Sequence, residues 1–206
     1  MNKLAIPALA MVVAFAATAH AQVAVKTDPA AVPSGAYSVN ADHTQVMFSI
    51  IHMGISPYFG RFGKASGSLQ FDAKDPEKSS VTIDLDMTGA NTTSDKLTGE
   101  LLSATVFDIS KFPKATFKST SIRKVTANAG DITGNLTLHG VTKPVTLRTA
   151  FHGITQNPSN GAARLGFSAT TRLKRSDFGI TGMQWAPMVS DQVDLAIEAE
   201  FVQDKK

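Results

Sequence analysis

The stretch Ser80–Thr88, SVTIDLDMT, alternates between polar and apolar residues at every position. Its apolar residues, from Val81 to Met87, fall on one face, and its threonines and aspartates fall on the other. This period of two predicts a β-strand with one buried and one wetted face. The runs QVDLAIEAEF (192–201) and PVTLRTAF (144–151) repeat the pattern, and several shorter runs resemble them. We therefore expect roughly eight or nine strands in an all-β protein.

Only the segment 94–104, SDKLTGELLSA, has helical spacing. Leu97 and Leu101 lie four residues apart on one face, and Ser94 can cap the first turn. Many strands, short turns and one helix favour an antiparallel barrel or a sandwich, and composition alone does not choose between them. In a barrel, we expect this short helix to lie near one mouth.

The N-terminus predicts export. Lys3 is followed by an apolar run from Leu4 to Ala17 and by the sequence Ala19-His20-Ala21, which is typical of a secretory signal peptide. We expect a signal peptide over 1–21, a flexible linker over 22–36, one barrel domain over 37–203 and a tail over 204–206, with a periplasmic location.

The composition excludes several classes of protein. The chain has no cysteine, so it has neither a disulfide framework nor a lipid-anchoring thiol, and we expect no stable membrane anchor. The formal charge is only +3 and the basic residues are scattered, so nucleic acid is not an expected partner. The sequence leaves the oligomeric state open, a homodimer included.

The run 45–53, QVMFSIIHM, is apolar on both faces, so both faces should be covered. Phe48, Ile50 and His52 share one face. Residues 54–63 then bring glycines that permit bends, together with three aromatic side chains. These aromatic residues could be ordinary core residues, or they could line a lumen that holds an apolar ligand.

Four stretches together resemble the YceI-like family of exported lipid-binding proteins. They are YSVNADHTQVMFSIIHMGIS (37–56) with GRF (60–62), FDISKFPKATFKSTSI (107–122), GNLTLHGVTKPVTL (134–147) and KRSDFGI (174–180). The resemblance implies an eight-stranded antiparallel, lipocalin-like barrel whose lumen binds a polyisoprenoid, such as a prenyl phosphate or a quinone. It also reveals one departure, because Glu100 stands where the family often has a histidine.

We predict a non-catalytic carrier of a long-chain isoprenoid or another amphiphilic lipid, with no cofactor, no metal and no catalytic residue. The expected ligand-binding residues are Phe48, Ile50, His52, Phe59, Phe62, Leu101, Phe107, Phe112, Phe117, Phe178 and Trp185. His43, His139 and His152 lack the spacing of a metal motif and are expected in turns and at strand ends. The alternatives are a hydrolase or isomerase acting on a lipid-like substrate, with His52 or His43 as base, and a ligand-free interaction module.

Overall fold

A computed structural model describes residues 23–205, so the predicted signal peptide and Lys206 lie outside the described residues. The strands are β1 (Gly35–Val39), β2 (Gln45–His52), β3 (Ser56–Arg61), β4 (Ala65–Phe71), β5 (Ser80–Asp86), β6 (Asn91–Thr92), β7 (Lys114–Lys124), β8 (Ala129–Leu138), β9 (Val141–Gln156), β10 (Ala163–Lys174) and β11 (Gln192–Gln203). The helices are α1 (Asp95–Leu102) and the 3-10 turns η1 (Pro29–Ala31), η2 (Pro76–Lys78), η3 (Arg175–Phe178) and η4 (Ala186–Met188).

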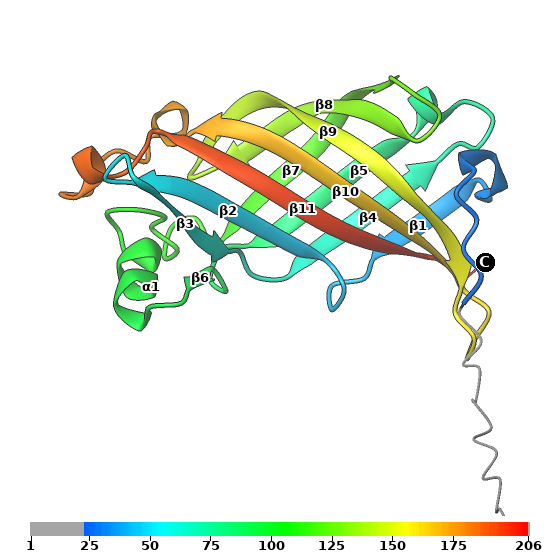
Figure 1. Ribbon diagram of the computed structural model, residues 1–206, viewed down its shortest axis with the longest axis horizontal. Coiled ribbons are helices and arrows are strands. Elements are labelled where there is room, and N and C mark those ends of the chain that lie inside the picture. Colours follow the sequence, from blue (N-terminus) through cyan, green and yellow to red (C-terminus); the bar gives the residue numbers. More distant parts are fainter. Residues whose placement is uncertain (1–22, 206) are drawn as a thin grey trace, which may run out of the picture.

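The strands form an eight-stranded closed antiparallel barrel, which confirms the predicted fold class (Figure 1). Sheet order runs β1-β4-β5-β7-β8-β9-β10-β11, and the ring closes where β1 pairs with β11. Further along β11, the same strand pairs with β2, which in turn pairs with β3. β1 and β2 therefore act as one interrupted barrel strand, and β3 and β4 act as another. Closure leaves few unpaired edges.

The pairing of neighbouring strands is interrupted at the α1 end of the barrel. There β6 pairs with β3 but, within residues 23–205, not with β7, which pairs instead with β5 and β8. α1 lies beside this end, as expected for a helix near a mouth, and lines the cavity there (Figure 1). It begins as predicted at Ser94, whose side chain accepts a hydrogen bond from the backbone N–H of Leu97. No helix among the described residues is long and apolar enough to cross a membrane.

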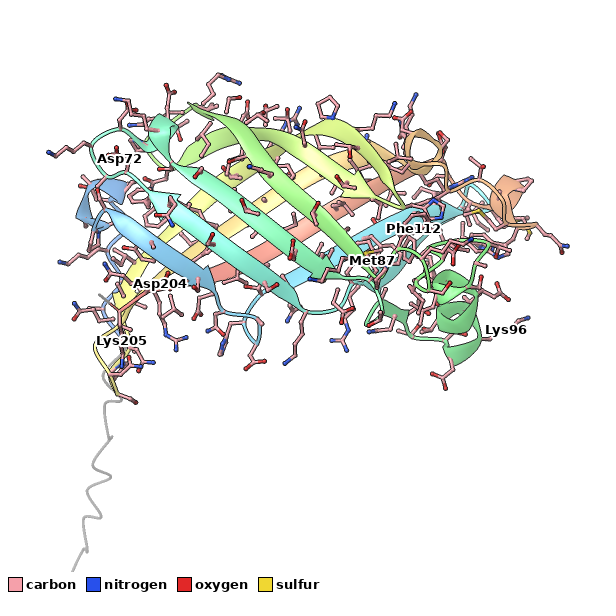
Figure 2. All side chains as sticks on the ribbon, turned by 180° about the vertical axis from the view of Figure 1, so that it is seen from behind. Asp72, Met87, Lys96, Phe112, Asp204 and Lys205 are labelled. Carbon is pink, nitrogen blue, oxygen red and sulfur yellow. The ribbon has the colours of Figure 1, made fainter. Side chains whose placement is uncertain are left out.

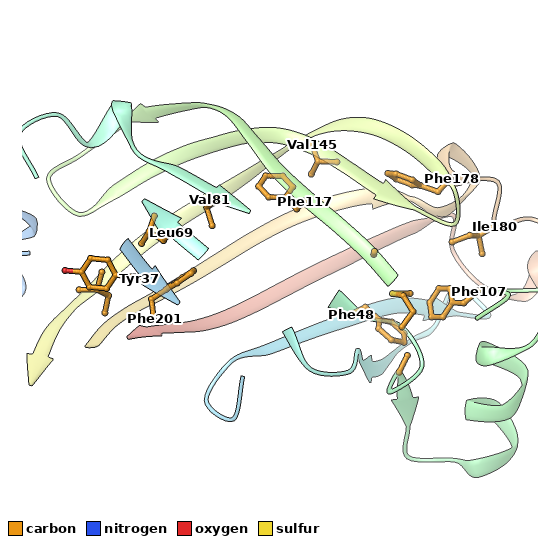
Figure 3. Close-up of a cluster of buried hydrophobic side chains, with 14 of the residues drawn as sticks. Tyr37, Phe48, Leu69, Val81, Phe107, Phe117, Val145, Phe178, Ile180 and Phe201 are labelled. Carbon is orange, nitrogen blue, oxygen red and sulfur yellow. The ribbon is translucent and has the colours of Figure 1, made fainter. Parts of the chain in front are cut away.

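The far half of the barrel is a packed core. Tyr37, Leu69, Val81, Phe117 and Phe201 are buried inside it and come from five different strands (Figure 3). Polar side chains project outward around the barrel (Figure 2), so most strands have the alternation that the sequence predicts. Each fully buried large apolar side chain contributes roughly 1.5–3 kcal/mol, and this burial stabilises a chain without disulfides.

Residues 23–36, expected to be a flexible linker, pack on the far end of the barrel. Lys26 forms a two-way backbone bridge with Ile154 in β9, and Val32 is only 2% exposed. The Tyr37 hydroxyl donates a hydrogen bond to the carbonyl of Pro33 at 2.8 Å. The segment is ordered because it supplies backbone partners for β9 and apolar cover for the core. Prolines and small residues alone gave no sign of this packing.

Candidate functional site

A cavity of about 540 Å³ lies inside the barrel at the α1 end. This volume is within the range of small-molecule sites. The lining is mostly apolar and comes from β2, β3, α1, β8, β10, β11 and the loops of the mouth. Its apolar residues are Val46, Phe48, Ile50, Phe62, Leu85, Leu97, Leu101, Val106, Phe107, Leu136, Leu138, Leu173, Phe178, Ile180, Met183, Trp185, Met188, Val189, Val193 and Leu195.

A second hollow, of about 1290 Å³, is lined mainly by residues of β2, β9, β10 and β11 and shares Phe48, Leu173, Phe178 and Leu195 with the interior cavity. Its lining is rich in exposed polar and charged residues such as Lys143, Thr170 and Lys174. Arg172, which also lines it, is paired with Asp194 at 2.6 Å. This hollow is larger but wet and charged, so the interior cavity is the better candidate for an apolar ligand.

Strand alternation turns the aromatic side chains of the cavity wall inward. Phe48 points inward from β2, its ring lies 5.1 Å from that of Phe62, and Phe62 lies 5.8 Å from Phe107. Gly60, in β3, lies directly beneath the Phe48 ring. A Cβ added there would come within 2.6 Å of Phe48 Cε1 and closer still to Cζ. A glycine at this position therefore lets the phenyl ring lie flat against the neighbouring strand.

The structure brings eight of the predicted residues together around the cavity. They are Phe48, Ile50, His52, Phe62, Leu101, Phe107, Phe178 and Trp185. The side chain of His52 lies toward the cavity mouth. Its backbone also bridges to Val189, on the loop that borders the opening.

Three predicted residues lie outside the cavity. Phe59 is 61% exposed on the outer face of β3, because Tyr58 takes the inward position beside it. Phe112 packs against the ring of His139 at 4.7 Å, over the β8–β9 turn. Phe117 belongs to the packed core farther down the barrel. The interpretation of Phe59 as a lumen aromatic was wrong because Tyr58 pairs with the inward-facing Ile50, whereas Phe59 pairs with Ser49 on the opposite face, so the alternation of β2 continues into β3.

The outer face of β2 is also uncovered, contrary to the expectation that both faces are buried. Met47, Ile51 and Met53 are all exposed. α1 lies beside the mouth of the barrel and lines the cavity with Leu97 and Leu101 (Figure 1).

Sequence reasoning did not select several cavity residues. Leu136 and Leu138 on β8 and Val193 and Leu195 on β11 point into the cavity. Their alternation was visible in the sequence, but which end of each strand meets the cavity depends on barrel closure. Arg175 was not among the selected residues either.

Arg175 fixes the mouth loop. Its guanidinium donates hydrogen bonds to the carbonyls of Ile180 (2.9 Å), Ala186 (3.0 Å) and Ser190 (3.2 Å). Within residues 23–205 it forms no ion pair with a carboxylate. The three bonds hold the segment that carries Met183 and Trp185 over the opening.

Hydrogen bonds between Ser176 and Asp191 also hold the mouth loop, at its other end. The hydroxyl of Ser176 donates to Asp191 at 2.7 Å, and the backbone N–H of Ser176 donates at 3.0 Å. These hydrogen bonds, led by the hydroxyl, lower the pKa of the Asp191 carboxyl below its usual value. The carboxylate is therefore the form that fixes η3 at neutral pH.

Few polar groups reach the cavity lining: His52, Tyr58, Thr92, Lys96, Glu100 and Arg175. The hydroxyl of Tyr58 is buried and has no hydrogen-bond partner among the described residues. A buried hydroxyl without a partner is unfavourable, and a polar group of a ligand could satisfy it. Glu100 places a carboxyl group at the same mouth. This arrangement suits a long apolar tail with one polar head near the opening.

The remaining histidines have structural positions. Asn40 Nδ2 lies 2.9 Å from His43 Nδ1 in the β1–β2 turn, as the sequence predicted, and His139 Nδ1 lies 3.2 Å from the carbonyl oxygen of Phe178. His152 lies on β9, at the edge of a small surface hollow away from the cavity. Among residues 23–205, no group of three or more His, Cys, Asp or Glu side chains could hold a metal ion.

A family model for the YceI-like domain matches residues 37–201. The chain belongs to the YceI-like family. A UPF0312 protein of Pseudomonas putida is 37% identical over 163 residues, which cover 79% of this chain and 83% of that relative. Protein YceI of Salmonella arizonae is 40% identical with the same coverage. The resemblance drawn from the four sequence stretches is therefore confirmed.

Solved YceI-like structures share the fold. The YCEI protein of Campylobacter jejuni is 28% identical and aligns with a TM-score of 0.66, covering 75% of this chain and 90% of that one. A polyisoprenoid binding domain from Saccharophagus degradans, described as implicated in plant cell wall breakdown, aligns with a TM-score of 0.63 at 16% identity. It covers 82% of this chain and 98% of that domain, and at this identity it shows the YceI-like fold alone.

Proposed function

We propose that this YceI-like protein is a non-catalytic carrier in the periplasm that holds a polyisoprenoid or a similar amphiphilic lipid in the barrel. The observation that carries the proposal is the interior cavity, with its apolar wall and few polar groups. Family membership supports it, as does the polyisoprenoid-binding domain that shares the fold. The predicted signal peptide supports export.

The energetics suit a carrier. Each buried methylene contributes roughly 0.8 kcal/mol, so even a tail of moderate length gains several kcal/mol on leaving water. The same tail gains a similar amount in a membrane, so exchange between the two is nearly balanced. The unpartnered hydroxyl of Tyr58 favours a head group that accepts a hydrogen bond, such as a quinone carbonyl, a prenol oxygen or a phosphate. Glu100 disfavours a phosphate, whereas Lys96 and Arg175 in the same lining favour one, so the phosphate stays among the candidates.

The competing functions lack a comparable observation. His43 is bonded to Asn40 in a turn away from the cavity, so it is badly placed as a base for a bound lipid. His52 reaches the cavity mouth, but no described side chain forms a hydrogen bond with its ring. A ligand-free interaction module would need a filled barrel, whereas the α1 end encloses open volume.

The test is direct identification of a bound lipid. The protein is purified without detergent, extracted with organic solvent and analysed by mass spectrometry, and uptake of added ubiquinone or polyprenol is measured in parallel. Two neighbouring substitutions on β2 provide a matched pair, because Ile50 faces the cavity and Ile51 faces outward. Ile50→Asn should reduce uptake from solution at least about tenfold, since a polar group then lines the tail site, and Ile51→Asn should not.

Two results would overturn the proposal. One is a protein that neither carries nor takes up any such lipid. The other is equal uptake by both β2 variants and the unsubstituted protein. Tyr58→Phe distinguishes the head-group contact, because it should weaken binding of a quinone while leaving binding of a plain hydrocarbon unchanged.

A further inference from the structure

An exposed apolar surface lies beside the cavity opening. We call it the mouth patch and define it as Ile51, Met53, Ile55, Phe59 and Met188. Ile55 is 85% exposed and Met53 is 57% exposed, at the tip of the β2–β3 hairpin. Met188 lies beside them, because its carbonyl accepts a hydrogen bond from the N–H of Met53 at 2.6 Å. The hairpin tip, η4 and α1 lie at the same end of the barrel (Figure 1).

Methionine is an unfavourable residue for the backbone conformation at the hairpin tip. Met53 has a φ of 51° and Gly54 a φ of 73°, and the N–H of Ile55 donates to the carbonyl of His52 at 3.0 Å. A turn whose two central residues both have positive φ favours asparagine at the first of them, because its short polar side chain can hydrogen-bond to the nearby backbone in the left-handed conformation. Methionine is unfavourable there both in conformation and in exposure to water. A residue that is doubly unfavourable for the isolated protein points to a role at this tip.

The charge of the hairpin is suited to a lipid surface. From Gln45 to Gly63 the chain contains no aspartate or glutamate, and Arg61 is its only permanently charged side chain. Phosphate head groups would therefore meet no carboxylate on this element. A protein partner would more commonly be matched by a polar rim with charges of both signs.

The mouth patch is continuous with the cavity. Met188 is exposed and also lines the cavity, and so does Leu97 on α1. On β2, Ile51 faces outward while its neighbours Ile50 and His52 face the cavity. A lipid tail could thus pass from a surface that covers the patch into the barrel without crossing water.

We propose that the mouth patch docks on the surface of a lipid bilayer, with the cavity opening toward the membrane. This proposal rests on the proposed lipid-carrying function, because the bilayer is then the phase that supplies and receives the ligand. The side chains at the hairpin tip insert among the head groups, as amphipathic surfaces with apolar residues do.

The experiment measures flotation with phospholipid vesicles. The chain beginning at Gln22 is used, since it contains the whole closed barrel and lacks the apolar run of residues 4–17. Vesicles of phosphatidylcholine alone are compared with vesicles that also contain phosphatidylglycerol. The test variants are Met53→Asn and Ile55→Asp. The control is Val125→Asp, because Val125 is 53% exposed after β7, beside η2 at the other end of the barrel.

We expect the unsubstituted protein and Val125→Asp to float with vesicles, and Ile55→Asp to bind about tenfold more weakly. Met53→Asn is the sharper test, because asparagine suits the turn. That variant should be at least as resistant to urea as the unsubstituted protein and still bind vesicles more weakly. Transfer of quinone from vesicles should slow in both variants, while uptake of quinone from solution stays unchanged.

Equal flotation of all variants, or none by any, would overturn the docking proposal. A dimer that Ile55→Asp dissociates, without any vesicle binding, would assign the patch to a second copy of the chain instead. Uptake of quinone from solution tests the cavity separately. A protein that takes up quinone but ignores vesicles therefore refutes docking alone, whereas one that binds vesicles but takes up no lipid refutes the carrier.

Discussion

Replacing Gly60 with alanine tests how the cavity wall is built. The added Cβ would lie within 2.6 Å of Phe48 Cε1 and 3.0 Å from the carbonyl oxygen of Asn91. Because non-bonded carbons sit about 3.5–4.0 Å apart, the ring must retreat by about 1 Å or more. The ring is buried against Phe62, and its free direction is the cavity. We expect Gly60→Ala to lower the free energy of unfolding by about 1–3 kcal/mol and to weaken lipid binding.

The assay is urea unfolding followed by far-ultraviolet circular dichroism, together with quinone titration. Gly99→Ala is the matched control, because Gly99 lies in α1 with no atom within 4 Å of an added Cβ. It should raise the free energy of unfolding by up to about 1 kcal/mol, since alanine is the better helix former. The same chemical change is thus expected to act with opposite sign at two positions.

Phe48→Leu adds a rescue test, because leucine is smaller than phenylalanine at the point where the methyl group added by Gly60→Ala intrudes. In the double variant with Gly60→Ala, the loss of stability should be smaller than the sum of the two single losses. A Gly60→Ala protein as stable as the unsubstituted one, or strictly additive effects in the double variant, would refute this account of the wall.

Two further predictions concern the two ends of the barrel. Burial raises the pKa of Tyr37 above its ordinary value of 10.0. The contribution of the neutral phenol to the free energy of unfolding is therefore complete below pH 10 and declines as the pH rises further, because the phenol then ionises in the unfolded chain. Tyr37→Phe should remove that decline when urea unfolding is measured as a function of pH. It should also lower the free energy of unfolding by about 1 kcal/mol at neutral pH, because the hydrogen bond to Pro33 is lost. The same alkaline decline in the variant would contradict this reasoning. Arg175→Met should release the mouth loop, because the three guanidinium hydrogen bonds are lost. We expect faster proteolysis within 181–189 and a red-shifted emission of Trp185, with unaltered strand content. Unchanged proteolysis would contradict the role of the guanidinium.

Alternation in the sequence was enough to predict the strands and to group three residues on one face of β2, but not to decide which face is inward, because both faces are apolar. Phe48, Ile50 and His52 share parity, and all three reach the cavity. The helix was also predictable, because a capping serine and leucines four residues apart are local signals. The resemblance to the YceI-like family supplied the closed barrel, which periodicity could not separate from a sandwich.

The misplaced residues depend on long-range geometry. Phe59 and Phe62 lie three residues apart, so an alternating strand turns only one of them toward the lumen, and the pairing of β3 with β2 decides which. Phe117 faces inward as its parity requires, but whether an inward residue meets the cavity or the packed core depends on its height in the barrel. The ordered segment 23–36 depends on a partner in β9, which lies more than a hundred residues away in the sequence.

The packing of residues 23–36 over the far end has a kinetic consequence. With Val32, Tyr37 and Leu165 buried at that end, the barrel formed by residues 23–205 is closed there, and its cavity opens at the α1 end. A molecule that enters at the α1 end must leave by the same route, so a second molecule cannot push the first one through. Exchange of cargo would then be limited by the rate of departure, and the lifetime of the loaded state would be set at the mouth loop held by Arg175.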